Sequence, residues 1–126
     1  MAISVFDEFR PLQITNGSDR QTATFDPIPA GQILIVRFVS AQFLVPNGQR
    51  ITVLSLNFET GGAGSHSHMF VPVVTGKIGL VDMVVASQHT HFYVESGVVI
   101  TAFAIRESNT GISNGHMVVA GELVAA

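Results

Sequence analysis

Hydrophobic and polar residues alternate along most of this chain, and they do not recur at the spacing of three to four residues that an amphipathic helix requires. In the segment 51–60, one face holds Leu54, Leu56 and Phe58, and the residues between them are polar. The segment 98–107 alternates in the same way and is rich in β-branched residues, which favour strands. Because successive side chains of a strand point to opposite faces, this period of two predicts half-buried β-strands.

Turn-forming sequences separate the alternating runs. Pro46-Asn47-Gly48 joins two apolar runs, and Glu95-Ser96-Gly97 precedes another. Asparagine and glycine tolerate the positive φ that hairpin turns need. We expect strands near residues 12–16, 21–26, 32–45, 50–60, 66–75, 78–87, 89–96, 98–107 and 116–124.

Short strands, regular turns and the lack of a capped helical pattern together predict the fold class. We expect an all-β protein, an antiparallel two-sheet sandwich that is jelly-roll-like and has about nine strands. The length of 126 residues suits one β-sandwich domain over 1–126, in which residues 1–10 form an N-terminal arm or an edge strand.

The segment 32–45 differs from the other runs because both of its faces are apolar. In a two-sheet sandwich only one face of a strand meets the core, so something else must cover the second face. One interpretation is that the strand bends and changes sheets. The interpretation that we adopt is a subunit interface, formed by Ile33, Ile35, Val39 and Phe43.

The composition favours an assembled protein. Charged residues make up 12% of the chain, so a lone copy would have few charges with which to solvate its surface. We therefore predict a homo-oligomer, and analogy with jelly-roll head domains favours a trimer. Six basic residues against nine acidic ones form no basic stripe, which argues against nucleic acid as a partner. A hydrophobic content of 47% excludes intrinsic disorder.

The sequence also bears on location. It has no cysteine, so it can form no disulfide and offers no thiolate. Asp7 and Glu8 interrupt the N-terminal segment before a signal-peptide core could form. There is no run of about 18 apolar residues. We therefore expect no membrane span, and a cytoplasmic location by default or assembly into a larger particle.

Histidines are the best candidates for chemistry. They include two His-x-His pairs, His66 with His68 and His89 with His91. Residues i and i+2 of a strand point to the same side. Each pair could therefore direct two imidazoles at one divalent metal, and two neighbouring strands could supply four ligands for zinc, nickel or copper. The alternative is that the histidines are solvated or lie in an interface. The candidate metal ligands are His66, His68, His89, His91, His116 and Glu95.

The segment from His89 to Glu95 has the pattern His-x-His-x-x-x-Glu, which resembles the first metal motif of the cupins, a family of small jelly-roll barrels. The resemblance covers seven residues. It implies that His89, His91 and Glu95 bind a divalent metal inside the barrel of a metal-dependent enzyme. The alternation, however, places His89 and His91 on the face opposite Phe92 and Val94. We therefore expect these histidines to point outward or into an interface.

Other catalytic signatures are absent from the sequence. It contains neither the Gly-x-Ser-x-Gly of a nucleophile elbow nor a phosphate-binding loop. Asp82 lies within an apolar run, so we expect it to be buried and paired with Arg37 or Arg106. No catalytic residue and no cofactor-binding residue is predicted, and an enzymatic role is the less favoured reading.

The function that we predict is a non-enzymatic, self-assembling β-sandwich module with a structural or binding role. An appendage, a capsid-like unit and a ligand-binding head all fit this description. One alternative is a cupin-like metal-dependent enzyme that uses the paired histidines. The other is a lectin-like module whose ligand is a carbohydrate or another small molecule.

Overall fold

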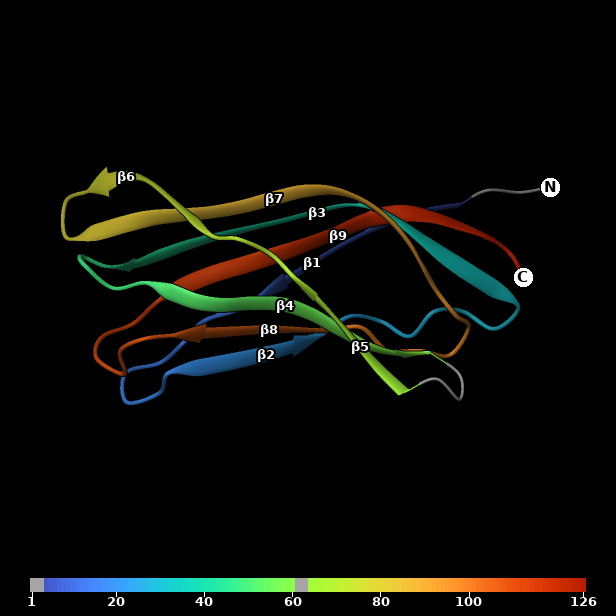
Figure 1. The fold of residues 1–126 in the computed structure, drawn as a ribbon, viewed down its shortest axis with the longest axis horizontal. Coiled ribbons are helices and arrows are strands. Elements are labelled where there is room, and N and C mark those ends of the chain that lie inside the picture. The colour runs from blue at the N-terminus through green and yellow to red at the C-terminus, as the bar shows by residue number, and fades with distance from the viewer. Residues whose placement is uncertain (1–3, 61–63) are drawn as a thin grey trace.

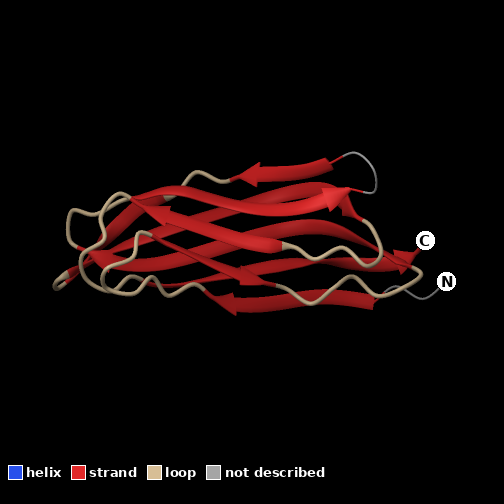
Figure 2. Cartoon of the chain, turned by 90° about the horizontal axis from the view of Figure 1, so that it is seen from below, coloured by secondary structure: helices blue, strands red, loops and turns tan. Residues whose placement is uncertain are grey.

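The computed structural model describes residues 4–60 and 64–126, which fold into two antiparallel β-sheets (Figure 1). The predicted all-β sandwich is confirmed, and Figure 2 shows strands and loops without a helix in the described ranges. No helix among these residues is long and apolar enough to cross a membrane. The nine strands of the described ranges are β1 (Ser4–Pro11), β2 (Arg20–Thr24), β3 (Gln32–Pro46), β4 (Ile51–Thr60), β5 (Gly64–Met69), β6 (Val73–Ile78), β7 (Val81–Val94), β8 (Thr101–Arg106) and β9 (Asn114–Ala125).

The strands pair in a nested order. The five-stranded sheet has the order β1-β9-β3-β7-β6, and the four-stranded sheet has the order β2-β8-β4-β5. The first strand therefore pairs with the last, β2 with β8, β3 with β7, and β4 with β5. The chain between β5 and β6 passes from one layer to the other (Figure 1).

Four predicted strands differ from those observed. The segment 12–16 forms only an isolated bridge between Ile14 and Ser113. The segment 66–75 is divided between β5 and β6, with Pro72, which lacks a backbone N–H for a ladder, in the gap between them. The predicted strands 78–87 and 89–96 are largely one strand, β7, which starts after a turn at Gly79 with φ +60°.

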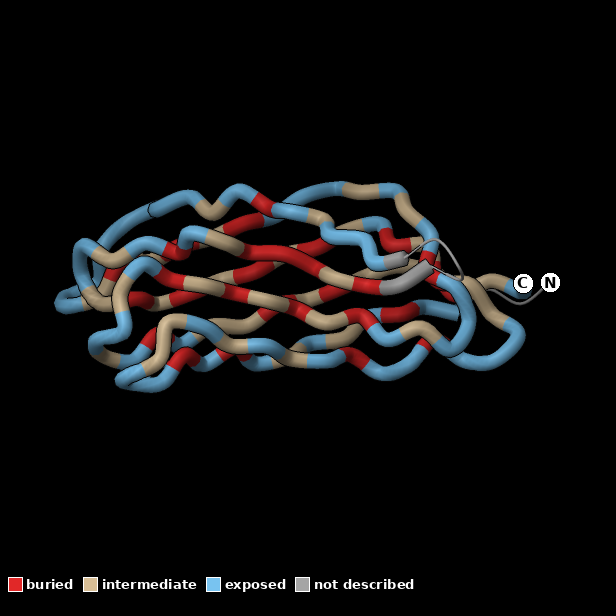
Figure 3. Tube along the Cα trace, turned by 60° about the horizontal axis from the view of Figure 1, so that its bottom comes forward, coloured by how far each residue is buried: buried red, intermediate tan, exposed pale blue. Residues whose placement is uncertain are grey.

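The core lies between the two sheets and consists of the inward residues of β1, β3, β4, β7, β8 and β9 and of buried loop residues (Figure 3). Leu34 and Val36 of β3 meet Leu54 and Leu56 of β4 in one buried cluster with the inward residues of β7, β8 and β9. These positions follow the alternation in the sequence. The burial of one face per strand explains why the period of two identified most of the strands.

A β-bulge explains why both faces of β3 look apolar in the sequence. On the neighbouring strand β9, adjacent residues pair with Val36 and Phe38, so Arg37 is the extra residue of β3. The inward face therefore changes from even to odd numbers at this point. Consequently Val39 and Phe43 are core residues, 2% and 1% exposed. The predicted interface was wrong at these two positions.

The other two predicted interface residues, Ile33 and Ile35, are half-buried on the outer side of the sheet. Beyond the bulge, the outward residues of β3 are Phe38, Ser40, Gln42 and Leu44. A single inserted residue thus exchanged the two faces, because each step along a strand reverses the side on which the next residue lies.

Asp82 is buried as expected, but the predicted pairing with an arginine was wrong. Its Oδ2 accepts a hydrogen bond of 3.0 Å from the backbone N–H of Gly48, in the turn between β3 and β4. Arg37 instead faces Glu122, with 3.5 Å between Nη2 and Oε2. The carboxylate of Asp82 therefore fastens a turn.

Arg106 is 1% exposed and bridges three loops at one end of the sandwich. Its acceptors among the described residues are uncharged oxygens, the shortest contact being 2.7 Å from Nη2 to the carbonyl of Gly111. Several carbonyls that point inward thus share one buried cation. The remaining acceptors are the carbonyls of Thr15, Ser18 and Thr110 and the Oε1 of Gln49.

Candidate functional site

The outer face of the five-stranded sheet is mostly apolar, although it faces away from the core. At its two edges large side chains are strongly exposed, including Val5 at 82%, Phe9 at 54% and Ile78 at 56%. Monomeric proteins rarely expose an apolar patch that covers a whole sheet. The apolar residues of this outer face are Val5, Phe9, Pro11, Ile33, Ile35, Phe38, Leu44, Val73, Ile78, Val81, Met83, Val85, Tyr93, Val118, Ala120 and Val124.

The outer face of the four-stranded sheet has the opposite character. Its residues are mainly hydroxyl and amide side chains, and Asn57 accepts hydrogen bonds from the hydroxyls of Ser55 and Ser67. Such a face is solvated without a partner. The outward residues of this sheet are Arg20, Thr22, Thr24, Val53, Ser55, Asn57, Ser65, Ser67, Met69, Thr101, Phe103 and Ile105.

A cluster of contacting polar side chains lies within the apolar outer face. Arg37 lies between Glu122 and His91, with 2.6 Å between its Nη1 and the Nδ1 of His91. A guanidinium only donates, so the Nδ1 of His91 is the acceptor in this contact. The Nε2 of the same ring lies 3.1 Å from the hydroxyl of Tyr93. The charges on this part of the face are therefore internally paired.

His66 and His68 lie on the other sheet and face inward. They pair with Phe58 and Leu56 of β4, whose side chains are buried, and paired residues share a side. The ring of His68 stacks on that of Phe92 from β7, with centroids 4.0 Å apart. The rings of His68 and Phe92 thus meet between the two sheets at the edge strand β5, while His66 stays exposed. Both histidines lie on the side of their sheet opposite to Ser65 and Ser67.

Burial is the main cause that lowers the pKa of His68, and the neighbouring His66 lowers it further. Above a pH of about 6.5 the side chain is neutral in both the folded and the unfolded chain, so it adds no pH dependence. As the pH falls through that value, the unfolded chain binds a proton that the folded chain resists. His68 therefore makes the fold less stable in acid.

We expect the variant His68→Phe to lose less stability in acid than the intact protein. Phenylalanine keeps a ring against Phe92 and removes the proton-binding group. The measurement is the melting temperature at pH 8 and at pH 5.5 for both proteins, at one fixed chain concentration. An equal loss in the intact protein and in His68→Phe would contradict the assignment to His68.

The predicted metal ligands do not converge within one copy. His89 lies beside Phe38 and His116 beside Phe9, with ring centroids 5.1 and 4.9 Å apart, while Glu95 follows the end of β7. No three side chains of His, Cys, Asp or Glu within residues 4–60 and 64–126 are grouped closely enough to hold a metal ion. His89 and His91 are exposed on the outer face, as the alternation predicted. The described residues therefore do not fit the inward metal site that the cupin resemblance implies.

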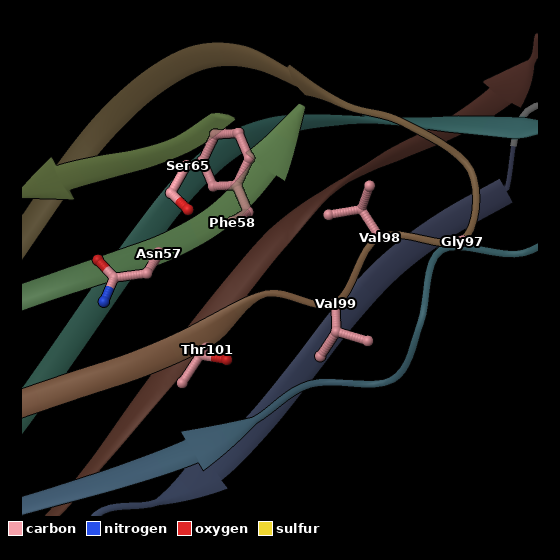
Figure 4. Close-up of a pocket in the computed structure, with 7 residues that line it drawn as sticks. All are labelled: Asn57, Phe58, Ser65, Gly97, Val98, Val99 and Thr101. Carbon is pink, nitrogen blue, oxygen red and sulfur yellow. The ribbon is translucent and has the colours of Figure 1, made fainter. Parts of the chain in front are cut away.

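A hollow of about 470 Å³ lies at one end of the four-stranded sheet (Figure 4). It offers the polar side chains of Asn57, Ser65 and Thr101 beside Val98 and Val99. The described residues that line it include no charged side chain, and their only aromatic ring, that of Phe58, is buried and offers no face to a sugar. The carbohydrate alternative therefore stays a prediction.

No protein-family model matches the sequence, and no curated protein matches it at a significant level. The function must therefore be argued from the residues of this chain.

Proposed function

We propose that this protein is a non-enzymatic β-sandwich module that self-assembles by burying the outer face of its five-stranded sheet against further copies. The observation that carries this proposal is the contrast between the two outer faces. The outer face of the five-stranded sheet is mostly apolar, and its charged residues Arg37 and Glu122 are paired with each other. The outer face of the four-stranded sheet is rich in hydroxyl groups. Water solvates the second face well, whereas covering the first removes apolar area from water.

The size of the face supports this assignment. With about 3.3 Å per residue along each strand and about 4.8 Å between strands, the five strands present an area on the order of 800 Å². A stable protein–protein interface buries about 800 Å² on each partner. The face is thus large enough for a specific interface without help from the loops.

The nested strand pairing supports a finer description of the fold. A long hairpin whose two arms roll together into a two-sheet barrel pairs its first strand with its last, its second with its next to last, and so on. The pairs from β1–β9 to β4–β5 follow this rule, with β6 as an additional edge strand. We infer a jelly-roll arrangement, a fold that suits an assembling structural unit or a ligand-binding head.

We expect the variant Ile35→Asp to dissociate into single folded chains. Ile35 is half-buried on the central strand β3, near one end of the outer face, and a carboxylate there would place a second negative charge beside Glu122 inside the interface. The matched control is Ile105→Asp, which places the same change on an inner strand, β8, of the other outer face, also near one end of its sheet.

The measurement is mass by light scattering, together with circular dichroism as a check that both variants stay folded. The control should keep the mass of the intact protein. If Ile35→Asp also keeps that mass, the five-stranded face is not the interface.

A further inference from the structure

Two features of the outer face lie on one row that crosses all five strands. The pairing registers connect Pro11 to His116, His116 to Gln42, Gln42 to Val85, and Val85 to Val73. Directly paired residues share a side of the sheet. The row therefore joins the edge strand β1 to the opposite edge strand β6 at one height along the strands.

The first feature is a hollow at the β1 end of this row. Its volume is about 190 Å³, and the rings of Phe9 and His116, 4.9 Å apart, form one wall. The described residues that line it include no carboxylate, lysine or arginine, so an aliphatic side chain could enter without burying an unpaired charge. The lining residues are Phe9, Gln42, Leu44, Asn114, Gly115 and His116.

The second feature is an exposed aliphatic side chain at the β6 end. Val73 is 54% exposed, and its register partner Val85 lies on the outer side of the sheet. Val73 therefore projects from the same face as the hollow, at the same height, but from the opposite edge. Ile78, farther along the same strand, is 56% exposed.

We propose that Val73 of one copy inserts into the hollow beside Phe9 of the next copy, around a rotation axis parallel to the strands. This inference rests on the proposed self-assembly and specifies which parts of the face meet. A rotation about such an axis leaves every height unchanged, so it carries the β6 edge of one copy onto the β1 edge of its neighbour along the same row. Repetition of one such contact by a rotation that closes gives an assembly without a free edge.

The absence of cysteine from the sequence makes this contact directly testable. Two single variants, Val73→Cys and His116→Cys, are mixed in the reduced state, allowed to exchange subunits, and then oxidised. Within one copy the two positions are three strands apart, about 14 Å. That is too far for a disulfide, whose Cα atoms must lie within about 7 Å.

We expect a disulfide-linked dimer in the mixture and little in either variant alone. The control mixture pairs Val73→Cys with Thr101→Cys, on the polar outer face. Because an assembled contact holds the two thiols at millimolar effective concentration, the cross-link should form on the order of a hundredfold faster than in this control. Leu44→Cys, on another wall of the hollow, is a second acceptor in case His116→Cys disturbs the packing.

The outcomes separate this inference from the proposal on which it rests. If the intact protein is a single chain in solution, self-assembly itself fails. If the protein assembles and neither acceptor cross-links faster than the control, the contact is wrong and the assembly stands. A rapid cross-link in Val73→Cys alone would also overturn the contact, since it would place two β6 edges together.

Discussion

Replacing Arg106 by methionine is expected to lower the free energy of unfolding by about 3–5 kcal/mol. Methionine fills much of the buried volume but donates no hydrogen bond. The three loops that the guanidinium bridges would then keep buried carbonyl groups without a donor, among them those of Ser18 and Gly111. The measurement is denaturant unfolding at one fixed chain concentration, because assembly also stabilises the folded state.

The matched control is Arg20→Met. Arg20 is exposed and pairs only with its neighbour Asp19 among the described residues, so its loss should leave the free energy of unfolding almost unchanged. If both variants lose the same stability, the buried guanidinium of Arg106 does not hold the three loops together.

The variant Gly121→Ala is expected to destabilise the protein by about 2–4 kcal/mol. Gly121 lies opposite the bulge of β3, and a Cβ built on it would overlap the backbone carbonyl oxygen of Ile35. Since that oxygen belongs to the backbone of a central strand, it cannot move aside as a flexible side chain would. The bulge would have to shift, and the pairing of β3 with β9 with it.

Gly76→Ala provides the control for Gly121. It also lies in a strand of the same sheet, but a Cβ there would meet no atom within 4 Å. Its unfolding free energy should stay within about 0.5 kcal/mol of the intact protein. Equal effects of the two substitutions in thermal or denaturant unfolding would show that the close approach at Gly121 is not tight.

The strands could be predicted from the sequence because their signal is local. In β4, the alternation of Leu54, Leu56 and Phe58 with polar residues is itself the pattern of burial. The same holds for β8, where Ala102, Ala104 and Arg106 all point inward. The place of Arg106 in this alternation was the signal that could have identified it as buried.

Features that depend on pairing between distant strands were not predictable from one strand alone. The bulge at Arg37 is defined only by its register with β9, so the inward positions of Val39 and Phe43 were assigned to the wrong side. The side of the sheet to which each histidine pair points also depends on pairing between strands. His66 and His68 alternate like His89 and His91, and only the register with β4 shows that they face the core.

The sequence predicted that an apolar outer face exists, but it did not predict how many strands this face covers. The sequence indicated a second apolar side for the segment 32–45, and the structure shows that this side continues across the neighbouring strands. Which strands lie beside β3 is a property of the fold, set by the nested pairing. The low content of charged residues also indicated an apolar surface, and this indication did not depend on which strands pair.

The most direct test of self-assembly is the mass of the intact protein in sedimentation equilibrium over a range of micromolar concentrations at neutral pH. One chain has a mass of 13.4 kDa. Burial of the five-stranded face predicts a single species with a mass of a whole-number multiple of that value, two or more. A monodisperse species of 13.4 kDa across the range would contradict it.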